Sequence, residues 1–188
     1  MHFPLDKFAV TGWKRALYVG ILLLLAWQLS RFWGQWREGV VSVFYCIHGP
    51  MHEVGHTVAG MAGLGRTAVL LAGTIFQLLT PVAVGVYLAC QGDLPAIALC
   101  VGWLGFSTME AGIYMYDANI QQLTLVVPFM DASGCEGDFT QLFRQWGCLE
   151  AGCRIGEAVV DIGYCLVYLA MLMIVVMLAV GFRRPAPQ

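Results

Sequence analysis

Long apolar stretches separated by short polar ones run through this 188-residue chain, and they predict five membrane-spanning helices. A helix needs about 20 mostly apolar residues to cross the hydrocarbon core of a bilayer. The stretches that approach or exceed this length cover about residues 16–30, 40–62, 68–90, 94–116 and 158–182. We therefore expect a single all-α membrane domain over residues 1–188. It would be a bundle of about five transmembrane helices with a polar, partly helical segment, 118–156, before the last span.

Basic residues flank the first span in a way that is typical of a membrane anchor. Lys7, Lys14 and Arg15 precede it and no small-residue cleavage site follows, so we expect a retained anchor rather than a signal peptide. The same basic residues favour a cytoplasmic N-terminus, whereas Arg183 and Arg184 after a fifth span favour the opposite orientation. The orientation therefore stays open. Tryptophans that are typical of interfacial anchors bracket the span: Trp13, Trp27, Trp33 and Trp36.

The polar segment has two features of its own. The apolar patch 123–130 is too short to span a bilayer, so we expect it to be re-entrant or interfacial. Residues 139–148 have the spacing of an amphipathic helix.

The composition supports a membrane protein and excludes one class of partner. Hydrophobic residues make up 59% of the chain and charged ones 12%, whereas soluble domains carry about 25% charged residues. A net charge of −2 gives no basic surface for nucleic acid, so the expected partners include a lipid bilayer and no nucleic acid. The seven cysteines are odd in number and form no C-x-x-C pair, which argues against a disulfide framework and against a thiolate zinc site.

The second predicted span contains the motif H-E-V-G-H at residues 52–56. On a helix, His52 and His56 lie one turn apart on the same face, and Glu53 lies beside them. This arrangement suits two zinc ligands and a general base. Each ionisable group inside a membrane segment costs roughly 2.5–3.5 kcal/mol and is generally retained for function. The motif therefore predicts a zinc site inside the membrane, with His52 and His56 as ligands and Glu53 as the catalytic base.

Two histidines do not complete a catalytic zinc site, which needs a third protein ligand and an open position. His48 lies one turn before His52, but a straight helix cannot wrap three such ligands around one ion. A break at Gly49-Pro50 would be needed to redirect it. Asp117, at the end of the fourth span, shares a helical face with Glu110, and each can also be read as an ordinary polar residue at or near a span end. The other acids near predicted membrane segments are Asp131, Asp138 and Asp161.

The apolar helix with H-E-V-G-H resembles the site-2 protease class of intramembrane zinc metalloproteases. More closely, the chain is similar to a group of small bacterial membrane proteins assigned to that class. Their pattern is H-E-x-G-H, then a glycine-rich span with Gln-Leu-Leu-x-Pro, then Trp-Leu-Gly before Tyr-Ile-Ala-Asp-Ala. The matching segments here are residues 52–60, 73–81, 103–105 and 114–118, and the likeness covers about residues 45–165.

This resemblance implies that an aspartate on a later segment is the third zinc ligand. Asp117 is the first choice by that likeness, although Ala118 follows it where the larger site-2 proteases have glycine. Asp138 is the second choice, because Gly137-Asp138-Phe139 keeps the aspartate and the aromatic residue of a His-Asp-aromatic element found in the group. The histidine of that element is not kept.

The function implied by the resemblance is a zinc-dependent intramembrane metalloendopeptidase, located in the bacterial inner membrane, that cleaves transmembrane protein substrates within or near the bilayer. Gln77 would bind an extended substrate strand or, alternatively, a neighbouring helix. With Asn119, Gln121 and Gln122 it is also a candidate for lining a water path to the site.

Two other functions stay open at this point. An inactive descendant would bind membrane proteins as a scaffold or hold zinc only structurally, which the departures from the family pattern favour. A metal or proton transporter would use His48, His52 and His56 as a pathway, although transporters generally have more spans and visible repeats.

Overall fold

The computed structural model describes residues 12–123 and 136–182, and these residues form helices and loops without any strand. The predicted all-α class is confirmed. In chain order, the elements are α1 (Trp13–Phe32), η2 (Trp36–Glu38), α2 (Tyr45–Met61), α3 (Arg66–Cys90), α4 (Leu94–Ile120), α5 (Asp138–Gln145), η3 (Leu149–Ala151) and α6 (Gly152–Phe182).

Four of these helices are long and apolar enough to cross a membrane, and they correspond to four of the five predicted spans. The predicted span over residues 40–62 is not confirmed, because its first residues form no helix and α2 is only 17 residues long. At 1.5 Å per residue such a helix is about 26 Å long, short of the roughly 30 Å hydrocarbon core. The four candidate spans are Arg15–Phe32, Arg66–Cys90, Ala96–Ile120 and Leu149–Val180.

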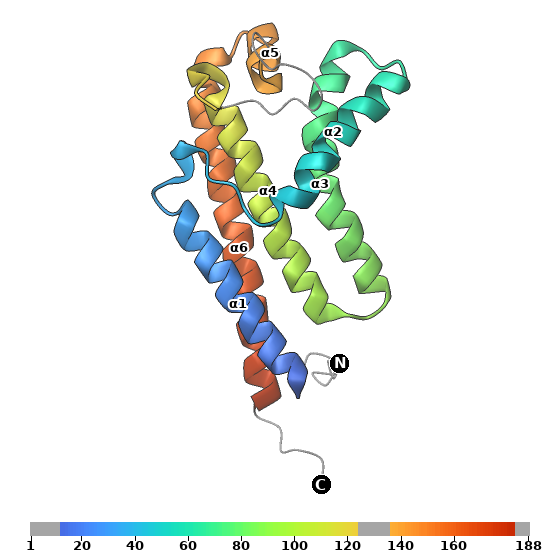
Figure 1. Ribbon diagram of the computed structural model, residues 1–188, viewed down its shortest axis with the longest axis vertical. Coiled ribbons are helices and arrows are strands. Elements are labelled where there is room, and N and C mark those ends of the chain that lie inside the picture. Colours follow the sequence, from blue (N-terminus) through green and yellow to red (C-terminus); the bar gives the residue numbers. More distant parts are fainter. Residues whose placement is uncertain (1–11, 124–135, 183–188) are drawn as a thin grey trace, which may run out of the picture.

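Residues 39–44, which we call the strap, replace the start of the expected span. Gly39 has a φ of 77°, in the left-handed region that favours glycine, and it ends the short helix η2. The strap then crosses the face of α4 on its way to α2 (Figure 1), where the Ser42 N–H donates a hydrogen bond of 2.6 Å to the Glu110 carboxylate. Val40 and Phe44 of the strap pack against the buried core, whereas Val41 and Val43 are exposed.

Helices α4 and α6 lie side by side over most of their length, and α1 packs along them (Figure 1). Glycines permit this approach: a Cβ at Gly105 would lie 2.9 Å from the Gly163 carbonyl oxygen, and a Cβ at Gly163 would lie 2.8 Å from that of Gly105. Small residues at such seams allow helix backbones to touch in membrane proteins. Leu25 and Phe32 of α1 and Phe106 of α4 belong to the buried core that joins the three helices.

Helices α2 and α3 form a second unit on the other side of α4 (Figure 1). Gly55 of α2 faces the Ala72 carbonyl of α3 so closely that a Cβ there would overlap the α3 backbone. This contact turns one face of α2 onto α3. His52 lies three positions before Gly55 and His56 directly follows it, so the contact also fixes where the two histidines lie.

The polar segment before the last span is partly helical, as predicted. The expected amphipathic helix over residues 139–148 corresponds to α5, which begins one residue earlier and ends three residues earlier. Phe139, Leu142 and Phe143 bury its apolar face. The apolar patch 123–130 lies outside the described residues except for Leu123, and α6 begins at Gly152 rather than at the expected residue 158.

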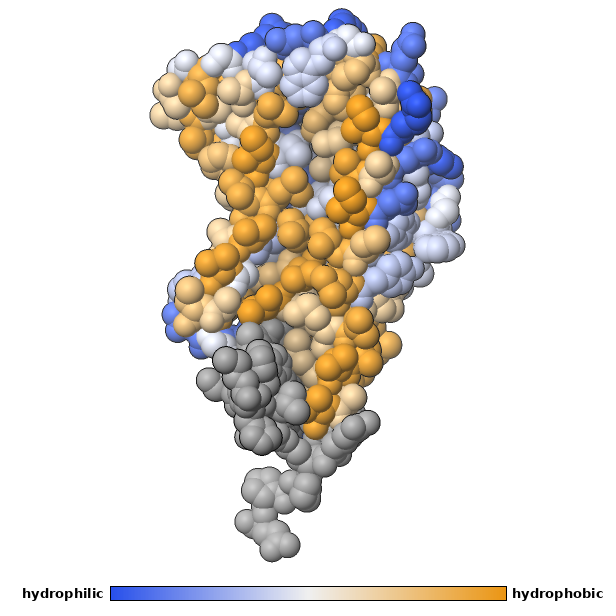
Figure 2. Space-filling view, turned by 180° about the vertical axis from the view of Figure 1, so that it is seen from behind, coloured by the Kyte–Doolittle hydropathy of each residue, from blue (hydrophilic) through white to orange (hydrophobic). Residues whose placement is uncertain are grey.

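The surface divides into a polar end and apolar sides. Hydrophilic residues gather at the end of the molecule that carries α5 and η3 (Figure 2), and apolar residues cover much of the remaining length. Large exposed apolar side chains include Leu79, Val86, Tyr87, Leu172 and Val176 on α3 and α6. Such a surface is compatible with an integral multi-pass membrane protein.

Candidate metal centre

Two helices bring His52, His56 and Asp138 together at the polar end of the α2–α3 unit. One carboxylate oxygen of Asp138, at the start of α5, lies 3.1 Å from Nε2 of His52 and 3.1 Å from Nε2 of His56. The three potential ligand atoms all lie within 4.8 Å of one another. The side chains are 14%, 21% and 15% exposed, so the cluster is largely but not completely shielded from solvent.

The Nδ1 atoms of both histidines have acceptors, so Nε2, which faces Asp138, is the nitrogen that each histidine could offer to a metal. Nδ1 of His56 lies 2.8 Å from the Val69 carbonyl oxygen, which can only accept, so this nitrogen carries the hydrogen. Nδ1 of His52 lies 3.2 Å from Oε1 of Gln77. The Gln77 amide is itself oriented, because its own nitrogen donates a hydrogen bond of 3.1 Å to the Ser107 carbonyl. Such partners are typical of metal-binding histidines, since they fix the ring orientation and the tautomer.

Gly73 provides the space in front of the two imidazoles. A Cβ at this position would lie 2.5 Å from Nε2 of His56 and 2.6 Å from Nε2 of His52, so a larger residue would fill the space between them. Two imidazole nitrogens and one carboxylate oxygen form a donor set that zinc accepts in catalytic sites, with a further position left for water. The residues present therefore fit a zinc ion.

Asp138 reaches the histidines because α5 is fixed to α4. Its backbone N–H donates a hydrogen bond of 2.8 Å to the Tyr114 hydroxyl, and the Thr140 hydroxyl donates to the Ala118 carbonyl at 2.9 Å. The position in the first turn of α5 also places the carboxylate at the positive end of a helix. Burial raises the pKa of Asp138, but the hydrogen bonds to His52 and His56 outweigh it and hold the pKa below its usual range.

Asp117, the first choice for the third ligand, is not part of this cluster. Its carboxylate accepts hydrogen bonds from the backbone N–H groups of Gln122 at 2.8 Å and Leu123 at 3.2 Å, at the end of α4. Those bonds stabilise the turn that follows α4, where Gln121 adopts a left-handed conformation. The structure therefore brings the second choice, Asp138, and not the first choice, Asp117, to the histidine pair.

A cavity of about 470 Å³ reaches one member of the cluster, His52. His52 and Glu53 line it together with the strap and the facing part of α4, so a carboxylate stands beside the candidate metal ligands. Gln77 and Gln122 also line it, in agreement with a water path, but Asn119 and Gln121 do not. The cavity thus combines polar groups with apolar walls, and its lining residues include Val40, Val41, Tyr45, Glu110, Ile113, Tyr114 and Leu123.

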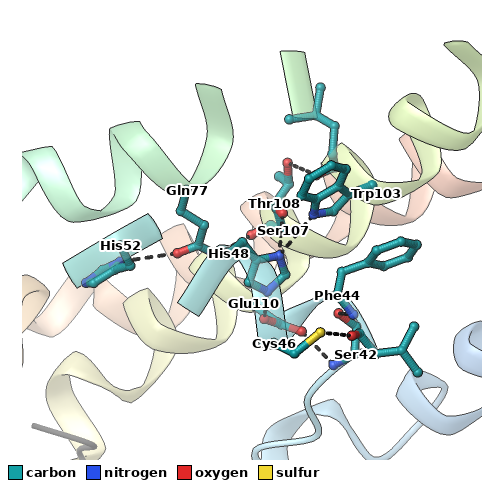
Figure 3. Close-up of polar contacts among 12 residues, drawn as sticks. Ser42, Phe44, Cys46, His48, His52, Gln77, Trp103, Ser107, Thr108 and Glu110 are labelled. Atoms are coloured by element: carbon teal, nitrogen blue, oxygen red, sulfur yellow. Dashed lines mark hydrogen bonds and ion pairs between the residues drawn. The ribbon is translucent and has the colours of Figure 1, made fainter. Parts of the chain in front are cut away.

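His48 lies in a separate, sealed network (Figure 3). It is 1% exposed, and its Nδ1 accepts from the Trp103 indole N–H at 3.4 Å and from the Ser107 hydroxyl at 2.7 Å. Because an indole nitrogen only donates, the hydrogen of His48 is on Nε2, which contacts the Glu110 carboxylate. Both ring nitrogens are occupied, so His48 provides no lone pair for a metal.

The position of Gln77 favours the neighbouring-helix interpretation over substrate binding. It is 7% exposed, and both ends of its amide are used, one toward His52 and the other toward Ser107 (Figure 3). Gln77 thus positions a candidate ligand.

Sequence reasoning missed Gly73, Tyr114 and the Val69 carbonyl. Gly73 interrupts an apolar span, which was a signal of close approach. Tyr114 precedes Asp117 by one turn on the same face of α4. The role of a backbone carbonyl leaves no trace in the sequence.

Comparisons with known proteins give no family for the chain: no family model matches it, and neither a curated protein nor a solved structure is found to match.

Proposed function

We propose that this protein is a zinc-dependent metalloendopeptidase embedded in a membrane, which hydrolyses peptide bonds of membrane proteins within or near the bilayer. The observation that carries the proposal is the convergence of two imidazole nitrogens and one carboxylate oxygen within 4.8 Å of one another, next to a cavity that His52 and Glu53 line.

His52, His56 and Asp138 would hold the ion, and each has a partner that fixes it. Gln77 orients His52, the Val69 carbonyl orients His56, and the fixed start of α5 orients Asp138. When bound there, zinc would supply a Lewis acid that polarises a carbonyl group and makes water more acidic.

Glu53 would be the general base and then the general acid. It lines the cavity next to His52, where an attacking water and the scissile carbonyl must meet. Its carboxylate would take a proton from the water as the new carbon–oxygen bond forms, and would return the proton to the amine as the carbon–nitrogen bond breaks.

The substrate class follows from the surface and from the size of the cavity. Four helices are long and apolar enough to span a bilayer, which would place the cavity where membrane proteins can reach it. A cavity of about 470 Å³ accepts an extended segment of a few residues rather than an intact helix about 10–12 Å wide. A substrate would therefore have to unwind locally, because helical carbonyls are already hydrogen-bonded.

The alternatives receive less support from the geometry. A metal pathway through His48, His52 and His56 would need His48 to offer a lone pair, and both of its ring nitrogens are occupied. An inactive scaffold would not require a cavity that a candidate metal ligand, His52, and a carboxylate, Glu53, line together.

The test is zinc stoichiometry and proteolysis by the full-length protein in detergent micelles. We expect about one zinc per chain in the wild type, and loss of zinc in His56→Ala and Asp138→Ala. Asp117→Asn is the matched control, because its amide oxygen still accepts from the turn, and it should keep zinc. Glu53→Gln should keep zinc and lose cleavage of unfolded casein. Absence of zinc from a well-folded wild type would contradict the proposal. Zinc binding without any cleavage would favour a scaffold, and full cleavage by Glu53→Gln would exclude Glu53 as the base.

A further inference from the structure

We propose that Tyr114 is a further catalytic residue, which donates a hydrogen bond from its phenol to the oxygen that becomes negatively charged when water adds to the substrate carbonyl. This inference rests on the proposed peptidase function and deepens it.

Tyr114 occupies the wall of the cavity that also contains His52 and Glu53. Its ring meets the imidazole of His52 edge-on, with the ring centroids 6.1 Å apart, and contacts Phe139 of α5 in the same manner at 5.5 Å. The phenol is therefore held between a candidate metal ligand and the helix that carries Asp138. A group held in this way is preorganised, so it loses little conformational freedom during the reaction.

Among the described residues, the hydroxyl of Tyr114 accepts one hydrogen bond and donates none. Its oxygen accepts the N–H of Asp138 at 2.8 Å, and within residues 12–123 and 136–182 no group accepts a hydrogen bond from it. The N–H of Asp138 occupies one side of the oxygen, so the O–H must point in another direction. A donor without an acceptor, fixed beside a cavity, is the arrangement that oxyanion stabilisation requires.

Gly137 allows the α5 backbone to lie close to the phenol. A Cβ at this position would lie 3.1 Å from the hydroxyl oxygen and 3.0 Å from a ring carbon of Tyr114. The glycine before Asp138 thus allows the α5 backbone to approach the phenol closely enough for the N–H to reach it.

The chemical step balances without a proton from Tyr114. One O–H bond of water breaks and its proton goes to Glu53, while the water oxygen bonds to the carbonyl carbon. The electron pair of the carbonyl π bond moves to the carbonyl oxygen, and the Tyr114 O–H donates a hydrogen bond to that charge. The pair then returns, the carbon–nitrogen bond breaks, and the amine receives the proton from Glu53.

A purely structural role for Tyr114 predicts a different result from a catalytic one. If the phenol only held Asp138, Tyr114→Phe would weaken zinc binding, because the third ligand would be less well positioned. If the phenol donates to the developing charge, zinc affinity is kept and transition-state stabilisation is lost. Tyr116→Phe is the matched control, since it removes a phenol from the same helix outside the lining of this cavity.

The experiment compares wild type, Tyr114→Phe and Tyr116→Phe as full-length proteins in micelles. It measures kcat and KM on unfolded casein, the zinc dissociation constant by competition with a chelator, and the dissociation constant of a blocked phosphinic tripeptide, whose tetrahedral oxygens mimic the developing charge. For Tyr114→Phe we expect kcat to fall about 100- to 1,000-fold, as after loss of one oxyanion donor. Phosphinic peptide affinity should fall in parallel, while KM and zinc affinity remain close to wild type.

Three outcomes would overturn the inference. Unchanged kcat and phosphinic peptide affinity in Tyr114→Phe would exclude donation by the phenol. A zinc affinity that falls by the same factor as kcat would assign Tyr114 to positioning Asp138. A wild type that binds no zinc and cleaves no casein would overturn the peptidase function as well, so the two failures are distinguishable. If the wild type binds zinc but does not cleave casein, the phosphinic peptide affinities of the wild type and Tyr114→Phe are compared instead. Equal affinities would then exclude donation by the phenol.

Discussion

Helix α2 carries two histidine clusters one turn apart, and they differ in how many of their polar atoms are already used. His48 is sealed: its two ring nitrogens and both Glu110 carboxylate oxygens have partners. His52 and His56 are open, because only their Nδ1 atoms have fixed acceptors and their Nε2 atoms converge on one aspartate oxygen. The same residue type on one helix thus occurs in two environments, and the hydrogen-bond partners distinguish them.

The difference shows that burial alone does not identify a functional histidine. His48 is the most buried of the three, yet a complete network leaves it no capacity for a ligand. At the open cluster, Gly73 has no side chain, so the space next to the two Nε2 atoms is not filled. Functional capacity follows from convergent lone pairs and available space.

The largest expected effect comes from closing the open cluster with Gly73→Ala. The new Cβ would lie within 2.6 Å of both Nε2 atoms, so we expect zinc affinity to fall by at least about 100-fold. The sealed cluster and the fold should be unaffected. The measurement is the zinc dissociation constant by chelator competition, with Gly60→Ala as control, because nothing lies within 4 Å of that position on α2. Equal zinc affinity in the two variants would show that Gly73 does not face a metal.

The sealed cluster is broken most directly by Glu110→Ala. This change leaves the Ser42 N–H and the His48 Nε2–H without their acceptor, at about 1–3 kcal/mol for each buried donor. We therefore expect the free energy of unfolding in micelles to fall by about 2–6 kcal/mol, while the folded fraction still binds about one zinc.

The matched control for Glu110→Ala is Asp161→Ala, which removes an exposed acid from α6 and should change the free energy of unfolding by about 0.5 kcal/mol or less. Loss of zinc from the folded fraction of Glu110→Ala would contradict the separation of the two clusters.

The sequence predicted the open cluster in part because helical periodicity is local. The i, i+4 spacing alone placed His52 and His56 on one face, with Glu53 beside them. The sequence alone did not decide which aspartate lies at the histidines. Asp117 and Asp138 are 21 positions apart, and it is the packing of α5 on α4 that brings Asp138 there. The resemblance favoured Asp117, but the turn after α4 uses that carboxylate for backbone N–H groups.

The sealed cluster and the strap were not predicted, for a related reason. Hydropathy gave residues 40–44 the pattern of a helix, because the pattern records apolar character and not where the backbone N–H groups find acceptors. Here the acceptor for the Ser42 N–H is Glu110, 68 positions away, and Gly39 turns the chain at the start of the strap. Pairings of this kind are tertiary, so a single sequence provides no period that reveals them.

The smallest expected effect tests the link between the two clusters, which meet at Ser107. Its hydroxyl donates to His48, whereas its backbone carbonyl accepts from Gln77 and so supports His52. Ser107→Ala removes only the first contact, and we expect a loss of about 1 kcal/mol in the free energy of unfolding with unchanged zinc affinity. Gln77→Ala removes the second contact and should weaken zinc binding about 10-fold or more, as loss of a partner behind a metal ligand does. Both variants are measured by unfolding in micelles and by chelator competition. A lower zinc affinity in Ser107→Ala would mean that loss of the contact to His48 also displaces Gln77 and His52. The two clusters would then be energetically coupled through Ser107.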